Sequence, residues 1–586
     1  MTDGHGRSAT TDRFEYDDDL LSALVVTHRP TLRPVVSPER DVSVLVYGEV
    51  YSRERDEGYQ RRPTGTSTSV YCGRAFAEDG IEALTQLNGE FVCIVVDHAR
   101  RIVRIVTDRL GSQPVYHYTR NGSVFFSTSI QALASHPSVR TGFEPSYLAE
   151  YLARKSVRGV RTPLAGIEQL PPATVTTIDP DSGSIERERY WQPVHRPDER
   201  PFGTFVDLFI DRFMAALDDR IRPNRRHGLL LSGGSDSRLI LAATESIHAY
   251  GFDDGSTDVE TATRVARRAG VAFTRLDGGP NQYRRLLERN AQHGNFVGWF
   301  NEGHAIGHQT TLRNGIDALV SGLYADVLFK GWTTPTLGLP VPGGSIRLPI
   351  ERPVESRETY LRTRPGRTPP YIDAAGEYRS ILDRNLVGSD RVRDHGIDYP
   401  SIPALARCGF WYPLTNETSF DRYSDQQVLP TVYPFLDRRL IDLSLRMPRR
   451  YALRYNLVDR ALTRLAPELA AIPHNETGVA LSRPRWVHRL ESLRSSHRSE
   501  SEGNAARLRE MEGLGSFLRS HESRIRALPL VEYDDVLATY HEHVAGADHT
   551  AALCGLVTVL GMPITETLTA SEVESRRPDP VRTRER

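Results

Sequence analysis

The stretch Leu229-Leu230-Leu231-Ser232-Gly233-Gly234-Ser235-Asp236-Ser237 runs from an apolar segment directly into two glycines and a group of hydroxyl and carboxyl side chains. The leucines are typical of a buried strand, and SRLILAAT, from Ser237 onward, is typical of a helix. Glycines at such a turn let backbone N–H groups approach an oxyanion, the helix N-terminus adds a positive dipole, and an Asp can hold Mg²⁺. The stretch predicts a phosphate-binding loop, and because no GK[ST] follows, it is not a Walker loop.

The segments around this loop alternate strands with helices. Residues 204–221 and 262–270 have helical apolar spacing, and residues 316–322 form a second strand that runs into a glycine. This alternation is typical of a doubly wound parallel sheet, which binds ligands at the carboxyl ends of its strands. We predict such a domain over residues 204–486, with the Pro- and Gly-rich segment 333–403 as an insertion or lid.

The rest of the chain follows other patterns. The N-terminal part has short β-branched and aromatic runs at 42–51, 90–108, 114–118 and 123–129. Turn residues separate these runs, which predicts an antiparallel, hairpin-rich domain over residues 20–195. We expect residues 1–19 to be a disordered tail, residues 192–203 to be a linker, and residues 487–586 to be a helical extension with a polar tail.

Composition excludes several classes of protein. The 586 residues carry 74 Lys and Arg against 75 Asp and Glu, so no global charge points to nucleic acid or to a membrane surface. No run approaches the ~18 apolar residues of a membrane helix. The four cysteines lack the CxxC spacing of a zinc site. We therefore expect a soluble, cytoplasmic protein with reduced, mostly buried thiols.

Several motifs in this order resemble one known family. SGGxDS at residues 232–237 resembles the pyrophosphate loop of the ATP pyrophosphatases, which leave AMP on an acyl group. LNGEF at 87–91 and TDRLG at 107–111 are similar to the core motifs of the glutamine-hydrolysing asparagine synthetases. YPFLD at 433–437 resembles that family's VPFLD, and SGLYAD at 321–326 stands where the family has SGEGSDE. The chain is identified as a member of this family over residues 40–485.

The resemblance implies a fold, cofactors and site residues. The fold is an N-terminal αββα sandwich of the N-terminal-nucleophile (Ntn) amidotransferase type, followed by a doubly wound ATP pyrophosphatase domain of the adenine nucleotide alpha hydrolase-like kind. The cofactors are ATP and Mg²⁺, with Asp236 and Asp326 holding the Mg²⁺-pyrophosphate. The residues expected to bind the nucleotide are Ser232, Gly233, Gly234 and Ser237 at the pyrophosphate, Leu231 and Tyr250 at adenine, and Ser321 and Gly322 beside them.

The N-terminal domain departs from the family where its chemistry is expected. Position 2 is Thr2, where the family has its nucleophilic Cys, and the nearest cysteine is Cys72. Tyr47 replaces the Asn of the oxyanion hole, and residues 65–69 lack the carboxylate that holds the substrate glutamine. Nucleophile, oxyanion donor and substrate anchor are separate requirements of acyl-enzyme chemistry, so we expect a degenerate glutaminase domain without glutaminase activity.

The synthetase domain also departs from the pattern. Leu323 replaces a family Glu, and the segment 474–478, where the family has a late catalytic Lys, contains no Lys. Lys330 is the only lysine of this domain, and we expect it to act with Asp326 in catalysis if the helix begins at Ala325. A helix-surface position for Lys330 and a substitute role for Arg238 are the two alternatives.

These observations lead to two hypotheses of different class. The first is an AMP-forming ligase that adenylates a carboxylate, by default aspartate, and passes it to ammonia or an amine. The change at Leu323 suggests a differently polar acyl pocket, as in family relatives that close β-lactam rings. The second hypothesis is a non-catalytic nucleotide-binding or regulatory homologue. Either is compatible with a homodimer.

Overall fold

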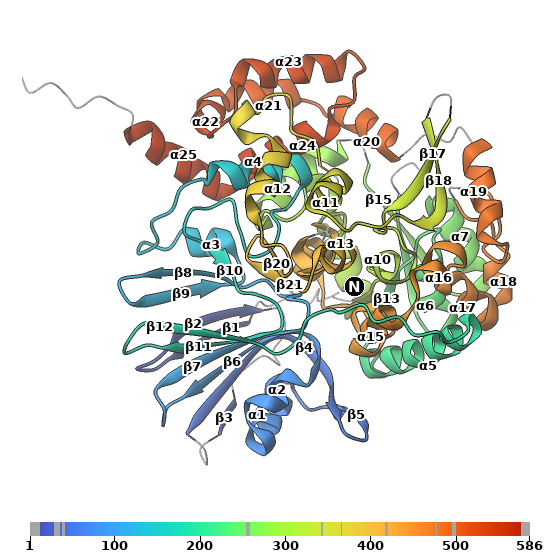
Figure 1. Cartoon of the computed structure of the whole chain (residues 1–586), viewed down its shortest axis with the longest axis horizontal. Helices are drawn as coiled ribbons and strands as arrows, with labels where there is room; N and C mark the ends of the chain where they lie inside the picture. Colours follow the sequence, from blue (N-terminus) through green and yellow to red (C-terminus); the bar gives the residue numbers. More distant parts are fainter. Residues whose placement is uncertain are drawn as a thin grey trace, which may run out of the picture.

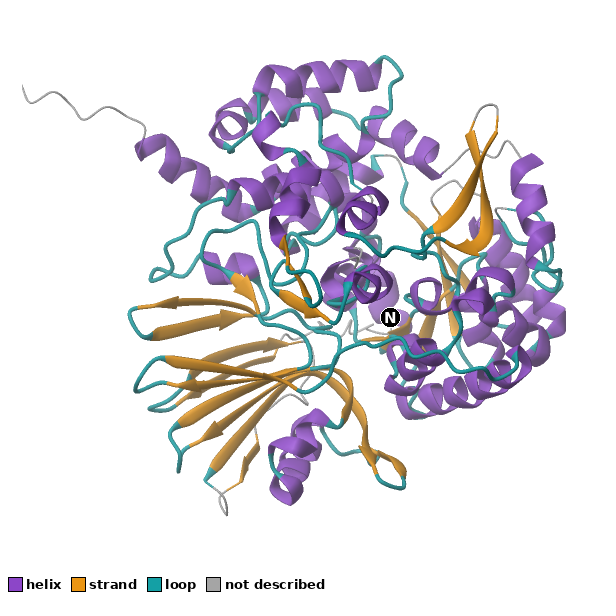
Figure 2. Ribbon diagram, viewed as in Figure 1, coloured by secondary structure: helices purple, strands orange, loops and turns teal. Residues whose placement is uncertain are grey.

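The structure is a computed structural model, and it describes residues 12–27, 35–37, 41–253, 258–279, 281–341, 344–364, 366–416, 420–475, 477–494 and 500–575. Two sheets dominate it (Figure 1). One is antiparallel and belongs to the N-terminal half, whereas the other is parallel and lies among helices (Figure 2).

The N-terminal half has four layers. Its large antiparallel sheet has the order β12-β11-β7-β6-β4-β3, with β5 on β4, and a smaller sheet has the order β10-β8-β9. Side chains alternate between the faces of β4 and β6, so that Val46 and Phe91 pack under helices while Leu45 and Val92 pack toward the smaller sheet. Helices α1 and α2 cover the first face, and α3 contacts β8 and β9. The arrangement confirms the predicted αββα sandwich.

The elements of this half have the following bounds. They are β3 (Val35–Ser37), β4 (Val42–Arg55), β5 (Gly58–Arg61), α1 (Thr68–Asp79), α2 (Ile81–Thr85), β6 (Leu87–Asp97), β7 (Ile102–Thr107), β8 (Tyr116–Arg120), β9 (Ser123–Ser127), α3 (Ile130–Ala134), α4 (Pro145–Arg154), β10 (Glu168–Gln169), β11 (Thr174–Asp179) and β12 (Ser184–Arg189).

Part of the expected N-terminal tail is ordered. Strand β1 (Asp12–Asp17) pairs in antiparallel register with β2 (Ser22–Thr27). Phe14 and Tyr16 alternate with charged residues along β1, and Tyr16 and Leu21 join the core between the large sheet and the smaller sheet. The prediction of a disordered tail is therefore wrong for residues 12–17, and residues 1–11 lie outside the described part.

The second half is built on five parallel strands in the order β15-β14-β13-β16-β22. Along the chain, β14 and β15 are added on one side of β13, and β16 and β22 are then added on its other side. The direction in which strands are added therefore reverses between β13 and β16. Leu229 and Val320 point into one core, whereas Tyr250 and Leu319 point into the core on the opposite face. Both faces are therefore covered, which confirms the predicted doubly wound sheet.

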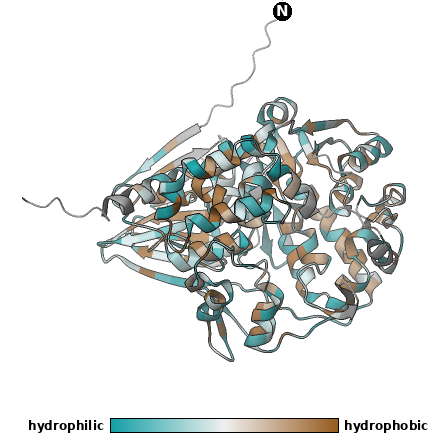
Figure 3. Ribbon diagram, turned by 90° about the horizontal axis from the view of Figure 1, so that it is seen from above, coloured by the Kyte–Doolittle hydropathy of each residue, from teal (hydrophilic) through white to brown (hydrophobic). Residues whose placement is uncertain are grey.

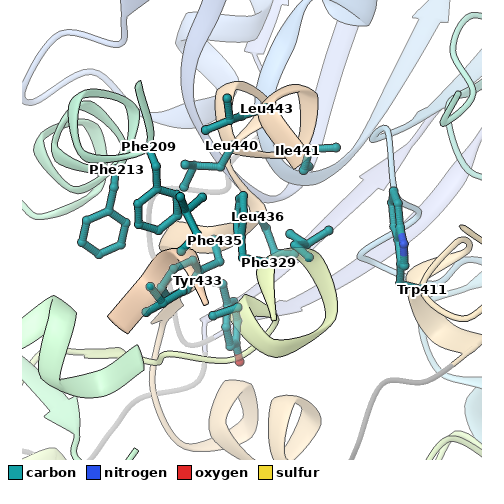
Figure 4. Close-up of a cluster of buried hydrophobic side chains, with 14 of the residues drawn as sticks. Phe209, Phe213, Phe329, Trp411, Tyr433, Phe435, Leu436, Leu440, Ile441 and Leu443 are labelled. Atoms are coloured by element: carbon teal, nitrogen blue, oxygen red, sulfur yellow. The ribbon is translucent and has the colours of Figure 1, made fainter. Parts of the chain in front are cut away.

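Helices from distant parts of the chain cover this sheet. Phe209 and Phe213 of α5 stack with Phe435 beneath it, and Phe209 contacts Phe329 edge-on (Figure 4). The bounds are α5 (Phe202–Arg220), β13 (His227–Leu230), α6 (Ser235–Ala242), β14 (His248–Asp253), α7 (Asp258–Ala269), β15 (Phe273–Asp277), α8 (Gln282–Asn290), α9 (Gln309–Gly315), β16 (Ala318–Val320), α10 (Ala325–Phe329), α13 (Ile402–Cys408), α14 (Phe420–Val428), β22 (Thr431–Val432), α15 (Arg438–Arg446), α16 (Arg449–Arg454), α17 (Leu457–Leu465) and α18 (Pro467–Ala470).

The inserted segment 333–403 has secondary structure of its own. It contains β17 (Thr336–Val341), β18 (Gly344–Glu351), α11 (Arg357–Thr363), α12 (Tyr378–Asn385), β19 (Leu386–Val387), β20 (Val392–Asp394) and β21 (Ile397–Tyr399). Helix α12 contacts α4 of the N-terminal half. The buried His395 ring lies 2.6 Å from Asp394 and 3.1 Å from Glu150 of α4. The insertion therefore joins the two halves of the molecule.

The described residues of the C-terminal extension are helical. It comprises α19 (Arg485–Arg494), α20 (Glu500–Arg509), α21 (Leu514–Ser520), α22 (Glu522–Ala527), α23 (Tyr533–Val544), α24 (Thr550–Gly561) and α25 (Pro563–Ser575). Helix α24 contacts α4 and α8 within one shared core. Hydrophobic and hydrophilic residues both occur along the helices of the molecule (Figure 3), and α24 is buried from Ala552 to Leu560. The tail beyond Ser575 lies outside the described residues.

Of the helices in the described part, none is by itself long and apolar enough to cross a membrane. Residues 550–561 and 563–570 would meet the length and composition criteria only together, as a pair bent by 75°.

A buried group of charges joins the two halves. Arg220, at the end of α5, lies 2.5 Å from Asp437 and 3.2 Å from Glu90 of β6, and its side chain is 0% exposed. Asn88 of the same strand donates a 2.9 Å hydrogen bond to Asp437. Burial favours the neutral acid, but Arg220 and Arg439 outweigh it and hold the pKa of Asp437 well below its usual range. The LNGEF and YPFLD motifs therefore meet at this interface.

We expect Asp437→Asn to lower the free energy of unfolding by about 3–5 kcal/mol, because it leaves the buried Arg220 undercompensated. Urea unfolding measures the loss. Asp317→Asn is the control, since Asp317 pairs with Arg226 at 2.9 Å on the surface, and exposed pairs contribute under about 1 kcal/mol. Equal losses of unfolding free energy in the two variants would contradict a stabilising role for the buried charges around Arg220.

Candidate active site

The predicted loop lies at the carboxyl end of β13, beside the end of β16. Gly234 caps α6, and Asp236 lies in its first turn. A Cβ on Gly322, which follows β16, would lie 3.0 Å from Cβ of Asp236 and 3.1 Å from the amide of Ser237. Glycine at this position therefore lets the Ser321–Gly322 turn approach the loop, and both strand ends face one crevice.

Three charged side chains predicted from the sequence meet in this crevice. Nζ of Lys330 lies 2.8 Å from Asp236 and 2.7 Å from Oδ1 of Asp326. Helix α10 begins at Ala325, so Asp326 and Lys330 project to the same side. The Lys330 side chain is 15% exposed, which rules out the alternative of a solvated surface lysine.

Burial and charge act in opposite directions on this cluster. Burial alone would lower the pKa of Lys330, but the carboxylates of Asp236 and Asp326 outweigh it and raise that pKa. Burial raises the pKa of Asp236 to about 7, and Lys330 opposes the rise. Lys330 is therefore an ammonium ion, and it lies between two carboxylates that a divalent cation can also use.

A further carboxylate, which the motifs did not reveal, lies near the cluster. Ser235, in the first turn of α6, and Lys330 both act on the carboxyl group of Asp459 of α17. Burial raises the pKa of Asp459, and the charge of Lys330 opposes that rise. Asp459 follows no recognisable motif in the sequence, so only tertiary packing reveals it. Among the described residues no group of three or more His, Cys, Asp or Glu is arranged to hold a metal ion. A Mg²⁺ at Asp236 and Asp326 would therefore take further oxygen ligands from phosphate and water.

The donors of the loop are bonded within the protein. The amide of Ser232 donates to Oγ of Ser237 at 3.0 Å, and the amide of Gly234 donates to Oγ of Ser232 at 3.2 Å. The amide of Gly233 donates to Oδ1 of Asp258 at 2.8 Å. A pyrophosphate that binds the Gly233 amide, as predicted, must first displace the Asp258 carboxylate from this amide.

The two residues predicted to contact adenine are bonded to each other through their backbones. The Leu231 amide donates to the Tyr250 carbonyl at 2.8 Å, so these two backbone groups satisfy each other. The Tyr250 side chain is buried in the core on the other face of the sheet. Any adenine contact by Leu231 or Tyr250 must use other backbone groups of these residues.

Arg238 has a structural position. Its side chain is fully buried and donates to the carbonyls of Gly233, Leu469, Ile472 and Pro473 at 2.7 to 3.1 Å. The alternative that Arg238 is the substitute phosphate cation is therefore wrong. The hydrogen bonds of Arg238 connect the loop to the segment that leads into residues 474–478.

That segment packs on the loop. Asn475 donates to Oδ1 of Asp258 at 2.8 Å. Burial, together with Arg238 and Lys330, lowers the pKa of His474 to about 4, so His474 is neutral near pH 7. Glu476 lies outside the described residues. Lys330 is therefore the lysine near the phosphate loop.

The described part of the N-terminal half holds no accessible thiol, and position 2, where the family has its nucleophile, lies outside that part. Cys72 of α1 and Cys93 of β6 are fully buried, and burial raises the pKa of Cys72 to about 12. Glu49 of β4 accepts hydrogen bonds from Arg62 at 3.0 Å and from Thr68 at 3.1 Å. The polar groups beside Tyr47 thus bind each other.

Comparison with known proteins agrees with this architecture. Residues 21–191 match the family model of the glutamine amidotransferase domain, and residues 209–475 match that of asparagine synthase. Together the matches span about three quarters of the chain. The chain is thus a two-domain protein with an amidotransferase-like half and a synthetase half. It belongs to the asparagine synthetase family.

Individual relatives match over part of their length. Carboxyethyl-arginine beta-lactam-synthase of Streptomyces clavuligerus is 30% identical over 244 residues, 40% of this chain and 45% of that protein. The glutamine-hydrolyzing asparagine synthetase 1 of Bacillus subtilis is 24% identical over 276 residues, 44% of this chain and 43% of that protein. The chain thus spans less than half the length of these curated relatives. Among solved structures, the B. subtilis glutamine phosphoribosylpyrophosphate amidotransferase complexed with ADP and GMP covers 42% of this chain and 47% of its own, with 10% identity and a TM-score of 0.18.

We expect Arg238→Met to lower the free energy of unfolding by at least about 2 kcal/mol, because buried carbonyls lose their donor. Denaturant unfolding measures the change, and Arg267→Met, on the exposed side of α7, is the control. Unchanged stability with loss of nucleotide binding would instead make Arg238 a phosphate ligand.

Proposed function

We propose that the protein is an AMP-forming ligase that activates a carboxylate with ATP and joins it to ammonia or an amine. The observation that carries the proposal is the meeting of Asp236, Asp326 and Lys330 beside the N-terminus of α6. Two carboxylates for a metal, an ammonium for phosphate and a helix N-terminus are what a nucleotide triphosphate site needs.

In the proposed reaction a substrate carboxylate oxygen attacks the α-phosphorus of ATP, and the bond to the departing pyrophosphate breaks. The amine nitrogen then attacks the acyl carbon, AMP leaves, and the amine loses a proton. Mg²⁺, when bound by Asp236 and Asp326, neutralises phosphate charge. Lys330 is charged and within reach of the same carboxylates, so it stabilises the negative charge that the pyrophosphate gains as it leaves.

We infer the class of acid substrate from the family, from Leu323 and from one relative. Aspartate is the default acid by family. Leu323 stands between the loop residue Gly322 and Asp326, and it brings an apolar side chain where the family has a carboxylate. The relative named carboxyethyl-arginine beta-lactam-synthase supports an acid other than aspartate. We therefore propose a panel of amino-acid derivatives as candidate substrates.

We also propose that the protein does not hydrolyse glutamine. Tyr47 stands where an amide donor is required, Glu49 is bonded to Arg62 and Thr68, and Cys72 and Cys93 are buried with unreactive thiols.

A second candidate is a nucleotide-binding homologue without turnover. The hydrogen bond from the Gly233 amide to Asp258 favours it, because a carboxylate occupies a donor of the loop.

ATP–pyrophosphate exchange with a panel of carboxylates tests the ligase proposal. We expect Asp236→Ala to abolish exchange while the thermal unfolding midpoint stays close to that of the wild type. We expect Lys330→Met to slow exchange at least ~10-fold, about 1.4 kcal/mol of transition-state stabilisation, with ATP still bound. Asp317→Asn, at a surface pair, is the control. Normal exchange in Asp236→Ala would overturn the site, and ATP binding without exchange for any acid would favour the second candidate.

We expect no release of glutamate from glutamine above the background rate, measured with the full chain in the presence and absence of MgATP. Release that Cys72→Ala or Cys93→Ala abolishes would contradict this expectation.

A further inference from the structure

A second polar hollow lies at the edge of the parallel sheet opposite the phosphate loop. His227, Ala318 and Thr431 line it, and they are the first residues of β13, β16 and β22. The four residues of β13 span about 13 Å, so the hollow is separate from the crevice at the carboxyl ends. The other wall comes from Glu49 and Tyr51 of β4 in the N-terminal half.

The lining of the hollow is cationic. Four arginines contribute to it, against a single carboxylate; they are Arg62, Arg220, Arg222 and Arg225. The carboxylate, Glu49, is bonded to Arg62 at 3.0 Å. Arg220 is already paired with Glu90 and Asp437. The positive charge of Arg222 and Arg225 is therefore in excess in this hollow.

Arg222 is the residue that needs a partner. It is 8% exposed, and its Nη2 atom is inaccessible and has no hydrogen-bond partner in the described part of the chain. Burial and the charge of Arg62 lower the pKa of Arg222, and Glu49 opposes this. A buried guanidinium group without a partner is costly, and folded proteins ordinarily supply a counter-charge.

We propose that this hollow binds a small oxyanion, a phosphate or a carboxylate, through Arg222. The planar guanidinium group matches both kinds of oxyanion in a two-point hydrogen-bonded geometry. The hollow and its opening to solvent together comprise about 320 Å³, and Arg225 is exposed beside it. An oxyanion enters there without passing the phosphate loop.

The position of the site predicts what the anion does. Arg62 and Glu49 belong to the N-terminal half, whereas Arg222 and His227 belong to the synthetase half. An anion bound by residues of both halves stabilises their interface. Because the loop lies at the opposite edge of the sheet, the anion and ATP bind without competing.

Calorimetric titration of the full chain at constant ionic strength tests the proposal. The probes are inorganic phosphate, glutamate and citrate, first without and then with saturating MgATP. We expect one saturable site that MgATP leaves unchanged, a Kd at least ~10-fold weaker in Arg222→Met, and a smaller loss in Arg222→Lys. Arg226→Met is the matched control, since Arg226 lies on the same loop but pairs with Asp317 at the surface.

The probes separate the possible sources of the anion. Tighter binding of phosphate assigns the site to phosphates, and tighter binding of glutamate or citrate assigns it to carboxylates. Equal binding by the wild type and Arg222→Met overturns the proposal, as does the absence of saturable binding for all three probes, which would make the hollow a water site.

A measurement of the unfolding temperature tests whether the Arg222→Met variant is still folded. In buffer without phosphate or carboxylates we expect Arg222→Met to unfold at the same temperature as the wild type or higher, because it removes an unpaired buried charge. Phosphate or a carboxylate should then raise the unfolding temperature of the wild type alone. A variant that unfolds earlier than the wild type, with the same rise on adding anion, contradicts the proposal.

Discussion

The burial of the Arg220 guanidinium group between Asp437 and Glu90 constrains the rest of the structure. Its side chain has no access to water, so its charge must be compensated by partners in fixed positions. One partner comes from β6 of the N-terminal sheet and the other from the residue that caps α15 of the synthetase half. Arg439 shares Asp437 and reaches Asp219 of α5 at 2.7 Å. Any slip of one half against the other would separate several charges at once.

The buried charges around Arg220 determine which edge of the parallel sheet lies near the N-terminal half. The group at Arg220 lies at the end of α5, and the cationic hollow continues from it along residues 222–227 to the amino ends of the strands. The carboxyl ends, with the loop and Lys330, are left for the nucleotide. Through Glu90 the N-terminal half thus contacts the synthetase half near the edge of the sheet that is remote from the proposed chemistry. Glu90 of this half is one of the charges that hold the interface together.

The sequence predicted what depends on local chemistry. SGGSDS predicted a strand, a turn and a helix, and the position of Ala325 at a helix start brought Asp326 and Lys330 to one side. It could not predict pairings between residues far apart in the chain, such as the bond from Gly233 to Asp258 or the four carbonyls around Arg238. Strand β1 carried a signal, the alternation of Phe14 and Tyr16 with charged residues, which the acidic residues 17–19 obscured.

The ion pairs of Lys330 with Asp236 and Asp326 also indicate which ligand this cluster can bind. Lys330 compensates Asp236 and Asp326, so a phosphate alone would draw Lys330 away and leave two carboxylates without a cation. A divalent metal alone would satisfy the carboxylates but would stand beside an ammonium ion of the same sign. A metal–phosphate complex would meet both demands, because Asp236 and Asp326 would hold the metal while Lys330 would hold the phosphate. If MgATP is the ligand, as proposed, the exchange of partners conserves every charge pair, and only Asp258 must leave the Gly233 amide.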